Sequence, residues 1–275
     1  ELQSSVADLS VDVATRLVGT DLSDAEHRAI IERYVNEAGD DLTIGTQTAY
    51  LLALRFKLVE DSLRETLIKR LEKKIIDNNY TLSTGFVGTG VLNQTLSELG
   101  LDDLAYSLLL QTADPSWLYS VRQGATTIWE RWNSYTLATG FGAVGMNSFN
   151  HYAYGAVLEW MYASMAGISP DPEQPGFGHF ILSPRPDMRR GDALPEGQEP
   201  ITFVKARYES VKGMICAAWE FEQGKFIYRV TIPAGTSARV EFPLINGGEM
   251  VTVNDLAMTA EELGVKIVGG KMVFE

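Results

Sequence analysis

Residues 123–132, QGATTIWERW, hold the side chains best suited to chemistry in this 275-residue chain. A single carboxylate, Glu130, lies between Trp129 and Arg131 in a run of mainly small and β-branched residues. Bulky rings remove water from a carboxylate and favour its neutral form, whereas a neighbouring guanidinium favours its charged form, so such a group can be poised for proton transfer. The alternative is a Trp–Glu–Arg cluster that packs and forms an ion pair without doing chemistry. Residue types alone do not decide between the two.

Composition narrows the class of protein and of ligand. With 45% hydrophobic residues, the chain has enough apolar material for one large domain or two of ordinary size. Its net charge of −13, with 36 acidic and 23 basic side chains, argues against nucleic acid or an anionic membrane surface as a partner and favours a neutral ligand. Cys216 is the sole cysteine, which excludes an internal disulfide. The three histidines are isolated from one another, so no metal site is expected.

The beginning of the chain predicts a piece of a longer protein. The first residue is Glu1 rather than Met, and the pattern of a helix begins almost at once. No apolar run approaches the length of about 20 residues that spans a bilayer, and no signal peptide opens the sequence. The compartment therefore stays open among cytoplasmic, periplasmic and secreted.

Residues 1–167 have the pattern of paired helices. Residues 46–58 are strongly apolar, whereas residues 61–76 carry Leu or Ile at every fourth position with charged residues between, which predicts an inner and an outer helix. Residues 82–90 hold three glycines that permit close backbone approach, and residues 114–119 predict a loop with two aromatic side chains. Further helices are predicted at residues 4–18, from a capping box at residues 23–26, and at residues 91–99, 101–111 and 146–165.

The pattern changes at residue 168, and residues 168–275 predict a second domain. Proline and glycine become frequent, helical spacing ends, and short alternating runs replace it. Residues 222–225 have the composition of a hairpin turn. The regular spacing of the runs predicts an antiparallel β-sandwich of about a hundred residues, with His179 in its first strand. The later strands are predicted at residues 201–209, 214–221, 226–232, 238–242, 250–253, 265–268 and 272–274.

Paired helices followed by a sandwich favour part of an α/α toroid, although the same helices could also form a bundle. The active sites of helical toroids lie at one end, in the loops that join inner helices. His151 stands near the start of a predicted helix and is expected at the same pocket mouth as Glu130. Glu159 lies about 12 Å further along that helix, so a structural or rim role is expected for it. The loops of suitable composition are residues 84–90, 117–132 and 140–151.

Five motifs, in this order, resemble the C-terminal part of bacterial α-L-rhamnosidases, glycoside hydrolase family 78. They are residues 47–50 (QTAY), 84–89 (TGFVGT), 115–119 (PSWLY), 123–132 (QGATTIWERW) and 147–157 (NSFNHYAYGAV). Residues 175–180 (PGFGHF) and 232–236 (IPAGT) resemble the C-terminal sandwich of the same enzymes.

The resemblance implies hydrolysis of terminal α-L-rhamnosyl residues, with inversion, inside an (α/α)6 barrel and without a redox cofactor. A rhamnose-containing glycan or glycoside would be the ligand. Glu130 would be the general base that activates water, and His151 would contact the sugar hydroxyls. Trp129, Trp132 and Trp117 would shape the pocket around the sugar ring.

The resemblance also implies a second carboxyl group, which this sequence does not provide. Inversion needs two carboxyl groups about 6.5–9.5 Å apart. The family's general acid lies in a D-x-x-x-R-D-E type of motif, and no such run occurs in residues 1–275. Asp102, Asp103 and Asp114 each have an ordinary capping or turn interpretation. The acid is therefore expected from the missing N-terminal part of the same polypeptide. Asn133 departs from the family's usual Asp beside the base but leaves the base in place.

Two other functions stay open at this point. One is a non-catalytic carbohydrate-binding or scaffold protein, which an upstream sequence without the acidic motif would favour. The other is an (α/α)6 glycosidase or lyase acting on a different sugar, which a panel of aryl glycosides would reveal. The natural aglycone, its linkage and the oligomeric state leave no trace in the sequence.

Overall fold

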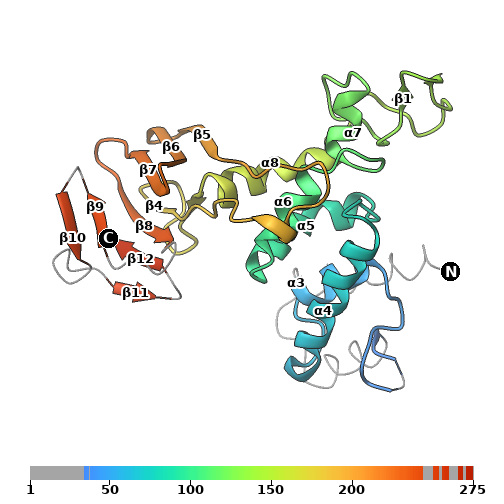
Figure 1. Cartoon of the computed structure of the whole chain (residues 1–275), viewed down its shortest axis with the longest axis horizontal. Helices are drawn as coiled ribbons and strands as arrows, with labels where there is room; N and C mark the ends of the chain where they lie inside the picture. The colour runs from blue at the N-terminus through green and yellow to red at the C-terminus, as the bar shows by residue number, and fades with distance from the viewer. Residues whose placement is uncertain are drawn as a thin grey trace. The chain divides into compact units, whose positions relative to one another are not determined.

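The computed structural model describes residues 34–36 and 38–243 and four later strands that end at residue 274. The helices predicted at residues 4–18 and from residue 23 lie outside the described residues. The chain divides into two compact units, Glu1–Val157 with Gly191–Gln198 and Leu158–Arg190 with Glu199–Glu275. Figure 1 labels the helices and strands of the two units. The domain boundary that the sequence places after residue 167 stays a prediction.

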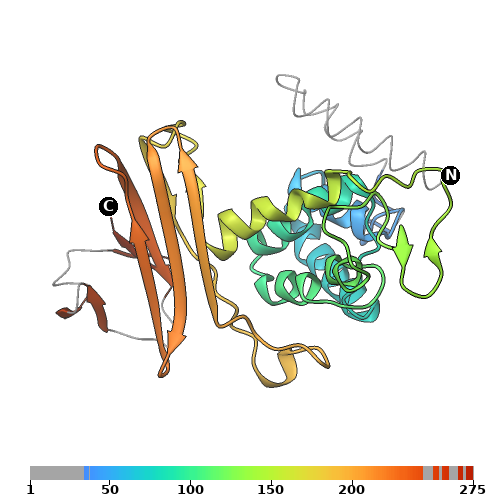
Figure 2. The ribbon, with the colours of Figure 1, turned by 90° about the horizontal axis from the view of Figure 1, so that it is seen from above.

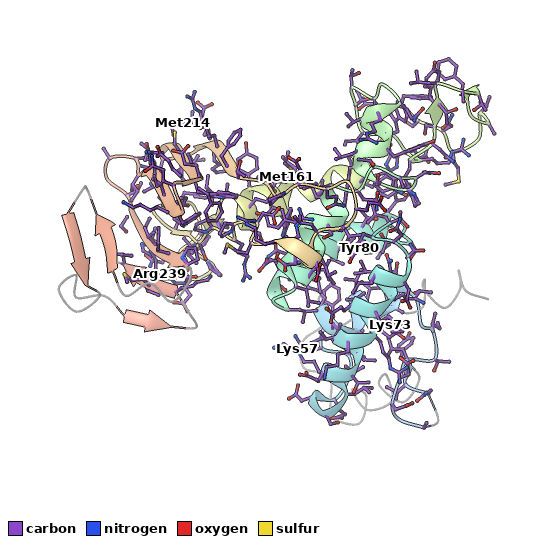
Figure 3. All side chains as sticks on the ribbon, viewed as in Figure 1. Lys57, Lys73, Tyr80, Met161, Met214 and Arg239 are labelled. Atoms are coloured by element: carbon purple, nitrogen blue, oxygen red, sulfur yellow. The ribbon has the colours of Figure 1, made fainter. Side chains whose placement is uncertain are left out.

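The first two described helices confirm the predicted inner and outer pair. Helix α3 (Gln47–Arg55) buries eight of its nine residues, so protein surrounds it on all sides. Helix α4 (Asp61–Asp77) buries a single stripe of apolar residues and packs against α3 with it. The opposite face of α4 is charged and exposed, as Lys73 illustrates: its ammonium pairs with Asp77 at 2.8 Å (Figure 3). The buried stripe consists of Leu63, Leu67, Leu71 and Ile75.

Helix α5 (Phe86–Glu98) begins earlier than the predicted start at residue 91. The prediction was wrong because it assigned Gly88 and Gly90 to a loop. Gly88 lies inside the helix where α5 meets α3, and a Cβ added to it would lie 2.5 Å from Thr48 Oγ1 and 3.0 Å from the side chain of Thr84. The absence of a side chain at Gly88 therefore sets how closely α3 and α5 approach each other.

We expect Gly88→Ala to destabilise the protein and Gly90→Ala to stabilise it, although both glycines lie in α5. The added methyl at Gly88 meets Thr48 and Thr84, and such overpacking costs about 1–3 kcal/mol. At Gly90 a Cβ would meet nothing within 4 Å, so alanine gains about 0.5–1 kcal/mol from its better helix propensity. Urea unfolding of the two variants measures both changes. If the two substitutions changed the free energy of unfolding equally, the close approach of α3 to α5 at Gly88 would be contradicted.

The rest of the first unit corrects two further predictions. Trp117 opens a helix instead of lying in a loop, because Ser116 caps that helix by accepting a hydrogen bond from the amide of Tyr119 at 3.1 Å. The helix predicted from residue 146 begins only at Ala153 and changes type along its length. Among the described residues, no helix is both long and apolar enough to cross a membrane. The further described elements of the first unit are α6 (Asp102–Leu109), α7 (Trp117–Arg122), β1 (Tyr135–Thr136), β2 (Gly140–Phe141) and the short helical turns Ala153–Ala156 and Gly191–Ala193. Helix α8 (Val157–Trp160) begins at the last residue of the first unit, and the helical turn Met161–Met165 lies in the second unit.

The second unit is a β-sandwich in which every predicted strand is present. Strands β5, β6 and β7 form one antiparallel sheet, and a five-stranded sheet has the order β11-β12-β8-β4-β3 (Figure 2). The predicted hairpin turn is confirmed, with Gln223 at φ 50° and Gly224 at φ 78°. The strands are β3 (Ile168–Pro170), β4 (His179–Leu182), β5 (Phe203–Ser210), β6 (Gly213–Glu222), β7 (Lys225–Thr231), β8 (Ser237–Pro243), β9 (Met250–Val253), β10 (Leu256–Thr259), β11 (Lys266–Val268) and β12 (Lys271–Phe274).

One strand pair departs from the predicted antiparallel arrangement. Strands β4 and β8 are parallel neighbours, with His179 opposite Ser237. Parallel neighbours need a long crossover, and the chain that forms β5, β6 and β7 supplies it. The core of the unit takes side chains from both sheets, among them Phe180 and Leu182 from β4 and Ile215 from β6. The sandwich is therefore antiparallel apart from this pair.

Candidate active site

A backbone pairing between two loop segments holds Glu130 and His151 in one local assembly. The amide of Glu130 donates to the carbonyl of Ser148 at 2.9 Å, and the amide of His151 donates to the carbonyl of Ile128 at 2.8 Å. These bonds also explain why the predicted helix starts late. The amides of Ser148 and His151 already bond to Glu130 and Ile128, and Met146 has a positive φ of 49°.

The carboxylate of Glu130 is oriented by the same pairing. The amide of Ser148 donates to Oε2 of Glu130 at 2.8 Å. Glu130 is half-buried, and no hydrogen bond from the described residues reaches its other oxygen, Oε1. One oxygen is thus fixed by the protein while the second can bind a water molecule or a hydroxyl group.

Arg131 does not form the ion pair with Glu130 that the sequence left open. Its Nη2 donates to the carbonyl of Ala143 at 2.9 Å, and a Cβ added at Gly142 would lie 3.0 Å from that nitrogen. Over the described part of the chain, the ion pairs include none between Arg131 and Glu130. The guanidinium therefore fixes the loop that carries Ala143, which weighs against a purely structural Trp–Glu–Arg cluster.

The three predicted tryptophans surround one cavity of about 290 Å³. Trp117 and Trp129 are each 7% exposed, and Trp132 stacks on Tyr154 with ring centroids 3.9 Å apart. The indole nitrogen of Trp117 donates to the carbonyl of Tyr154 at 2.8 Å. Four aromatic rings thus form part of the cavity wall, and small and β-branched side chains of residues 120–128 form the rest.

His151 is placed beside this cavity rather than among the residues that line it. Its ring stacks on Phe86, the first residue of α5, with centroids 4.6 Å apart and an angle of 21° between the planes. The amide of Ala153 donates to Nδ1 of His151 at 3.4 Å. That bond makes Nε2 the nitrogen that carries the proton in the neutral ring, so Nε2 can donate to a ligand hydroxyl.

Tyr154 links the aromatic cavity to the carboxylate. Burial raises the pKa of Tyr154, and the negative charge of Glu130 raises it further. Glu130 does not line the cavity, but Ile128 and Trp129, the two residues directly before it in the chain, do. The carboxylate and the cavity therefore belong to one site.

Two family models match the chain, and together they cover most of it. One, described as the bacterial alpha-L-rhamnosidase 6 hairpin glycosidase domain, matches residues 20–165 and thus more than half of the chain. The other, described as the bacterial alpha-L-rhamnosidase C-terminal domain, matches residues 167–257. The chain belongs to the bacterial α-L-rhamnosidase family. The resemblance drawn from the motifs is confirmed, and with it the partial six-hairpin toroid followed by a sandwich.

Curated relatives and solved structures agree with this assignment. An α-L-rhamnosidase from Formosa agariphila is 40% identical over 210 residues, which are 76% of this chain and 21% of that protein. One from Streptomyces avermitilis is 40% identical over 243 residues, which are 86% of this chain and 22% of that protein. The crystal structure of the Streptomyces avermitilis enzyme complexed with L-rhamnose matches with a TM-score of 0.74 and 35% identity, covering 90% of this chain and 22% of that one. The structure from Aspergillus terreus matches with a TM-score of 0.71 and 33% identity, covering 82% of this chain and 25% of that one.

The chain therefore spans about a fifth to a quarter of the length of these rhamnosidases. Within this piece, the reasoning from sequence missed two residues of the site, Phe86 and Tyr154. Both stand inside the rhamnosidase-like motifs, at residues 84–89 and 147–157, and this position was the signal that could have found them. In the described part of the chain, no three side chains of His, Cys, Asp or Glu come together to hold a metal ion.

Proposed function

We propose that this chain carries the general-base part of an inverting α-L-rhamnosidase. The observation that carries the proposal is the carboxylate of Glu130, which the Ser148 amide holds at 2.8 Å beside an aromatic cavity. A general base must be fixed in direction and have an oxygen open to water. Glu130 meets both conditions, because one of its oxygens is bonded to the backbone and the carboxylate is only half-buried.

The reaction that follows from this role is a single displacement. A water molecule between Glu130 and the anomeric carbon attacks from the face opposite the leaving group. Glu130 accepts the proton of the water as the new C–O bond forms, while an acid gives its proton to the glycosidic oxygen as the old C–O bond breaks. The sugar leaves with its anomeric configuration inverted.

Substrate binding is divided among the neighbouring side chains. Nε2 of His151 donates to a sugar hydroxyl, and the stacked rings of Phe86 and Tyr152 hold the imidazole at a fixed angle. Trp117, Trp129 and Trp132 shape the pocket around the sugar. L-rhamnose as the sugar is supported by the family and by the related Streptomyces avermitilis structure, whose complex contains L-rhamnose.

The general acid comes, in this proposal, from polypeptide outside residues 1–275. The sequence lacks the acidic motif, and the chain covers only 21% and 22% of two curated relatives. The intact enzyme is therefore this chain together with the preceding segment that supplies the acid.

The proposal is tested by assaying residues 1–275 and the intact enzyme on a panel of aryl glycosides. The intact enzyme is expected to cleave the α-L-rhamnoside in preference to the other glycosides, and residues 1–275 alone are expected to release nothing. Turnover by the isolated chain would mean that it contains an acid after all. Preference for another sugar would replace the substrate assignment, and sugar binding without cleavage of any glycoside would favour a binding or scaffold protein.

Ser148→Pro in the intact enzyme is expected to lower kcat by about 10–100-fold, because proline has no amide to hold Oε2 of Glu130. Ser148→Ala is the matched control. It keeps the amide and removes only the hydroxyl, which accepts from the amide of Asn150 at 3.2 Å, so most of the activity should remain. Steady-state kinetics of the two variants measure the difference, and similar losses in both would contradict a role for the amide.

A further inference from the structure

Tyr154 lies where three parts of the site meet. Its ring stacks on Trp132, with centroids 3.9 Å apart and an angle of 17° between the planes. The centroid of the Phe86 ring lies 5.0 Å from that of Tyr154. Its carbonyl accepts the indole N–H of Trp117 at 2.8 Å. Tyr154 is 8% exposed, so it is packed on nearly all sides. It therefore joins α5, α7 and the loop of Glu130 through contacts of its own.

The segment that carries Glu130 is held before and at the carboxylate by the backbone pairing with residues 148–151, and after it by the contacts of Trp132. The hydroxyl of Ser120 donates to the carbonyl of Trp132 at 2.7 Å, and Ser148 holds the carboxylate itself. The side chain of Trp132 is only partly buried, and the Tyr154 ring covers one face of its indole. A stacked aromatic pair of this kind contributes about 0.5–1.5 kcal/mol beyond the area that it buries. Removing the ring would therefore loosen the end of the segment next to Glu130.

We propose that Tyr154 is a positioning residue for the Glu130 carboxylate, because its ring fixes Trp132 and so fixes the direction of the neighbouring base. This inference rests on the proposed general-base function. Tyr154 acts through Trp132 and need not touch the substrate. The charge of Glu130 also contributes to the raised pKa of the Tyr154 phenol.

The ring and the hydroxyl can be separated by two substitutions. Tyr154→Leu removes the stack but keeps an apolar side chain, and Tyr154→Phe keeps the ring. We expect Tyr154→Leu in the intact enzyme to lower kcat by about 10–100-fold with a much smaller change in KM, because misplacing a reacting group mainly affects the chemical step. Tyr154→Phe should restore most of the lost kcat. Equal kcat in all three proteins, or a loss confined to KM, would overturn the inference.

A second measurement does not depend on activity or on how Tyr154→Leu folds. In the intact enzyme carrying ring-labelled tyrosine, NMR titration follows the Tyr154 phenol, whose signal is identified by its absence from the spectrum of Tyr154→Phe. Its pKa is expected above the ordinary value and should fall in Glu130→Gln, where the neighbouring negative charge is removed. A phenol with an ordinary pKa that does not respond to Glu130→Gln would overturn the inference.

The two proposals fail in different ways. If Glu130→Gln leaves the activity of the intact enzyme unchanged, the general-base function is wrong, and the positioning role falls with it. If Glu130→Gln removes activity but Tyr154→Leu does not, only the role of Tyr154 is wrong.

Discussion

Glu130→Gln in the intact enzyme is expected to lower kcat for an aryl α-L-rhamnoside by about 10²–10⁴-fold. The amide of glutamine is nearly the same size as the carboxylate, and its oxygen can still accept from the Ser148 amide, so the loop keeps its bond. It cannot accept a proton from water, however. The loss should therefore appear in kcat, with KM changed much less.

Glu159→Gln is the matched control for this substitution. Glu159 is an exposed carboxylate on α8, outside the site, and its replacement should leave the kinetics near those of the unmodified enzyme. Circular dichroism of both variants verifies that they fold. If Glu130→Gln had the same kcat and KM as Glu159→Gln, the assignment of Glu130 as the general base would be contradicted.

Gly167→Ala is expected to destabilise the sandwich by about 2–5 kcal/mol. Gly167 has φ +85°, which costs any residue with a Cβ about 1–2 kcal/mol. An added Cβ would also collide with the backbone nitrogen of Pro184 and would lie 2.6 Å from the carbonyl carbon of Ser183. These are backbone atoms, and the amide of Ser183 bonds to the carbonyl of Gly167 at 2.8 Å, so neither strand can move away cheaply.

Gly235→Ala separates the strain from the collision. Gly235 lies between β7 and β8 with φ +77°, and a Cβ there would meet nothing within 4 Å. Gly235→Ala should therefore lower the free energy of unfolding only by the roughly 1–2 kcal/mol that a left-handed backbone costs a residue with a Cβ. Chemical unfolding followed by tryptophan fluorescence compares the two variants. If Gly167→Ala lowered the free energy of unfolding no more than Gly235→Ala does, the close approach of Ser183 and Pro184 to Gly167 would be contradicted.

Local patterns were enough to predict most of the secondary structure. Helix α4 repeats Leu or Ile every fourth residue, and β6 alternates buried Ile215, Ala217 and Trp219 with more exposed residues. Both patterns follow directly from one buried face per element. The hairpin at residues 222–225 was predictable because Gly224 suits a positive φ.

Elements whose structure depends on distant contacts were predicted poorly. Residues 146–152 have helix-compatible types, yet the amides of Ser148 and His151 bond to Glu130 and Ile128 instead of forming a helix. Gly88 suggests a loop by propensity, but its contact with Thr48 on another helix determines its place in α5. The parallel pairing of β4 with β8 likewise depends on a crossover that no local pattern encodes.

In the candidate site, too, residues within sequence motifs were predicted, whereas the features that depend on distant contacts were not. Glu130, His151 and the three tryptophans were identified from motifs, and the structure brings them into neighbouring positions. The hydrogen bond from the Ser148 amide to Glu130 could not be predicted, because a backbone amide carries no signal in the sequence. Tyr154 was missed because a tyrosine in an aromatic helix has an ordinary packing interpretation until its stacking on Trp132 is known.

The anomeric configuration of the first product tests the central claim most directly. Loss of activity in Glu130→Gln establishes that the carboxylate is needed, whereas stereochemistry reports what it does. Proton NMR of the intact enzyme acting on an aryl α-L-rhamnoside should detect β-L-rhamnose first, because a water activated by Glu130 attacks opposite the leaving group. Early appearance of α-L-rhamnose would mean two displacements through a covalent intermediate, and it would contradict the role of Glu130 as the base that activates water.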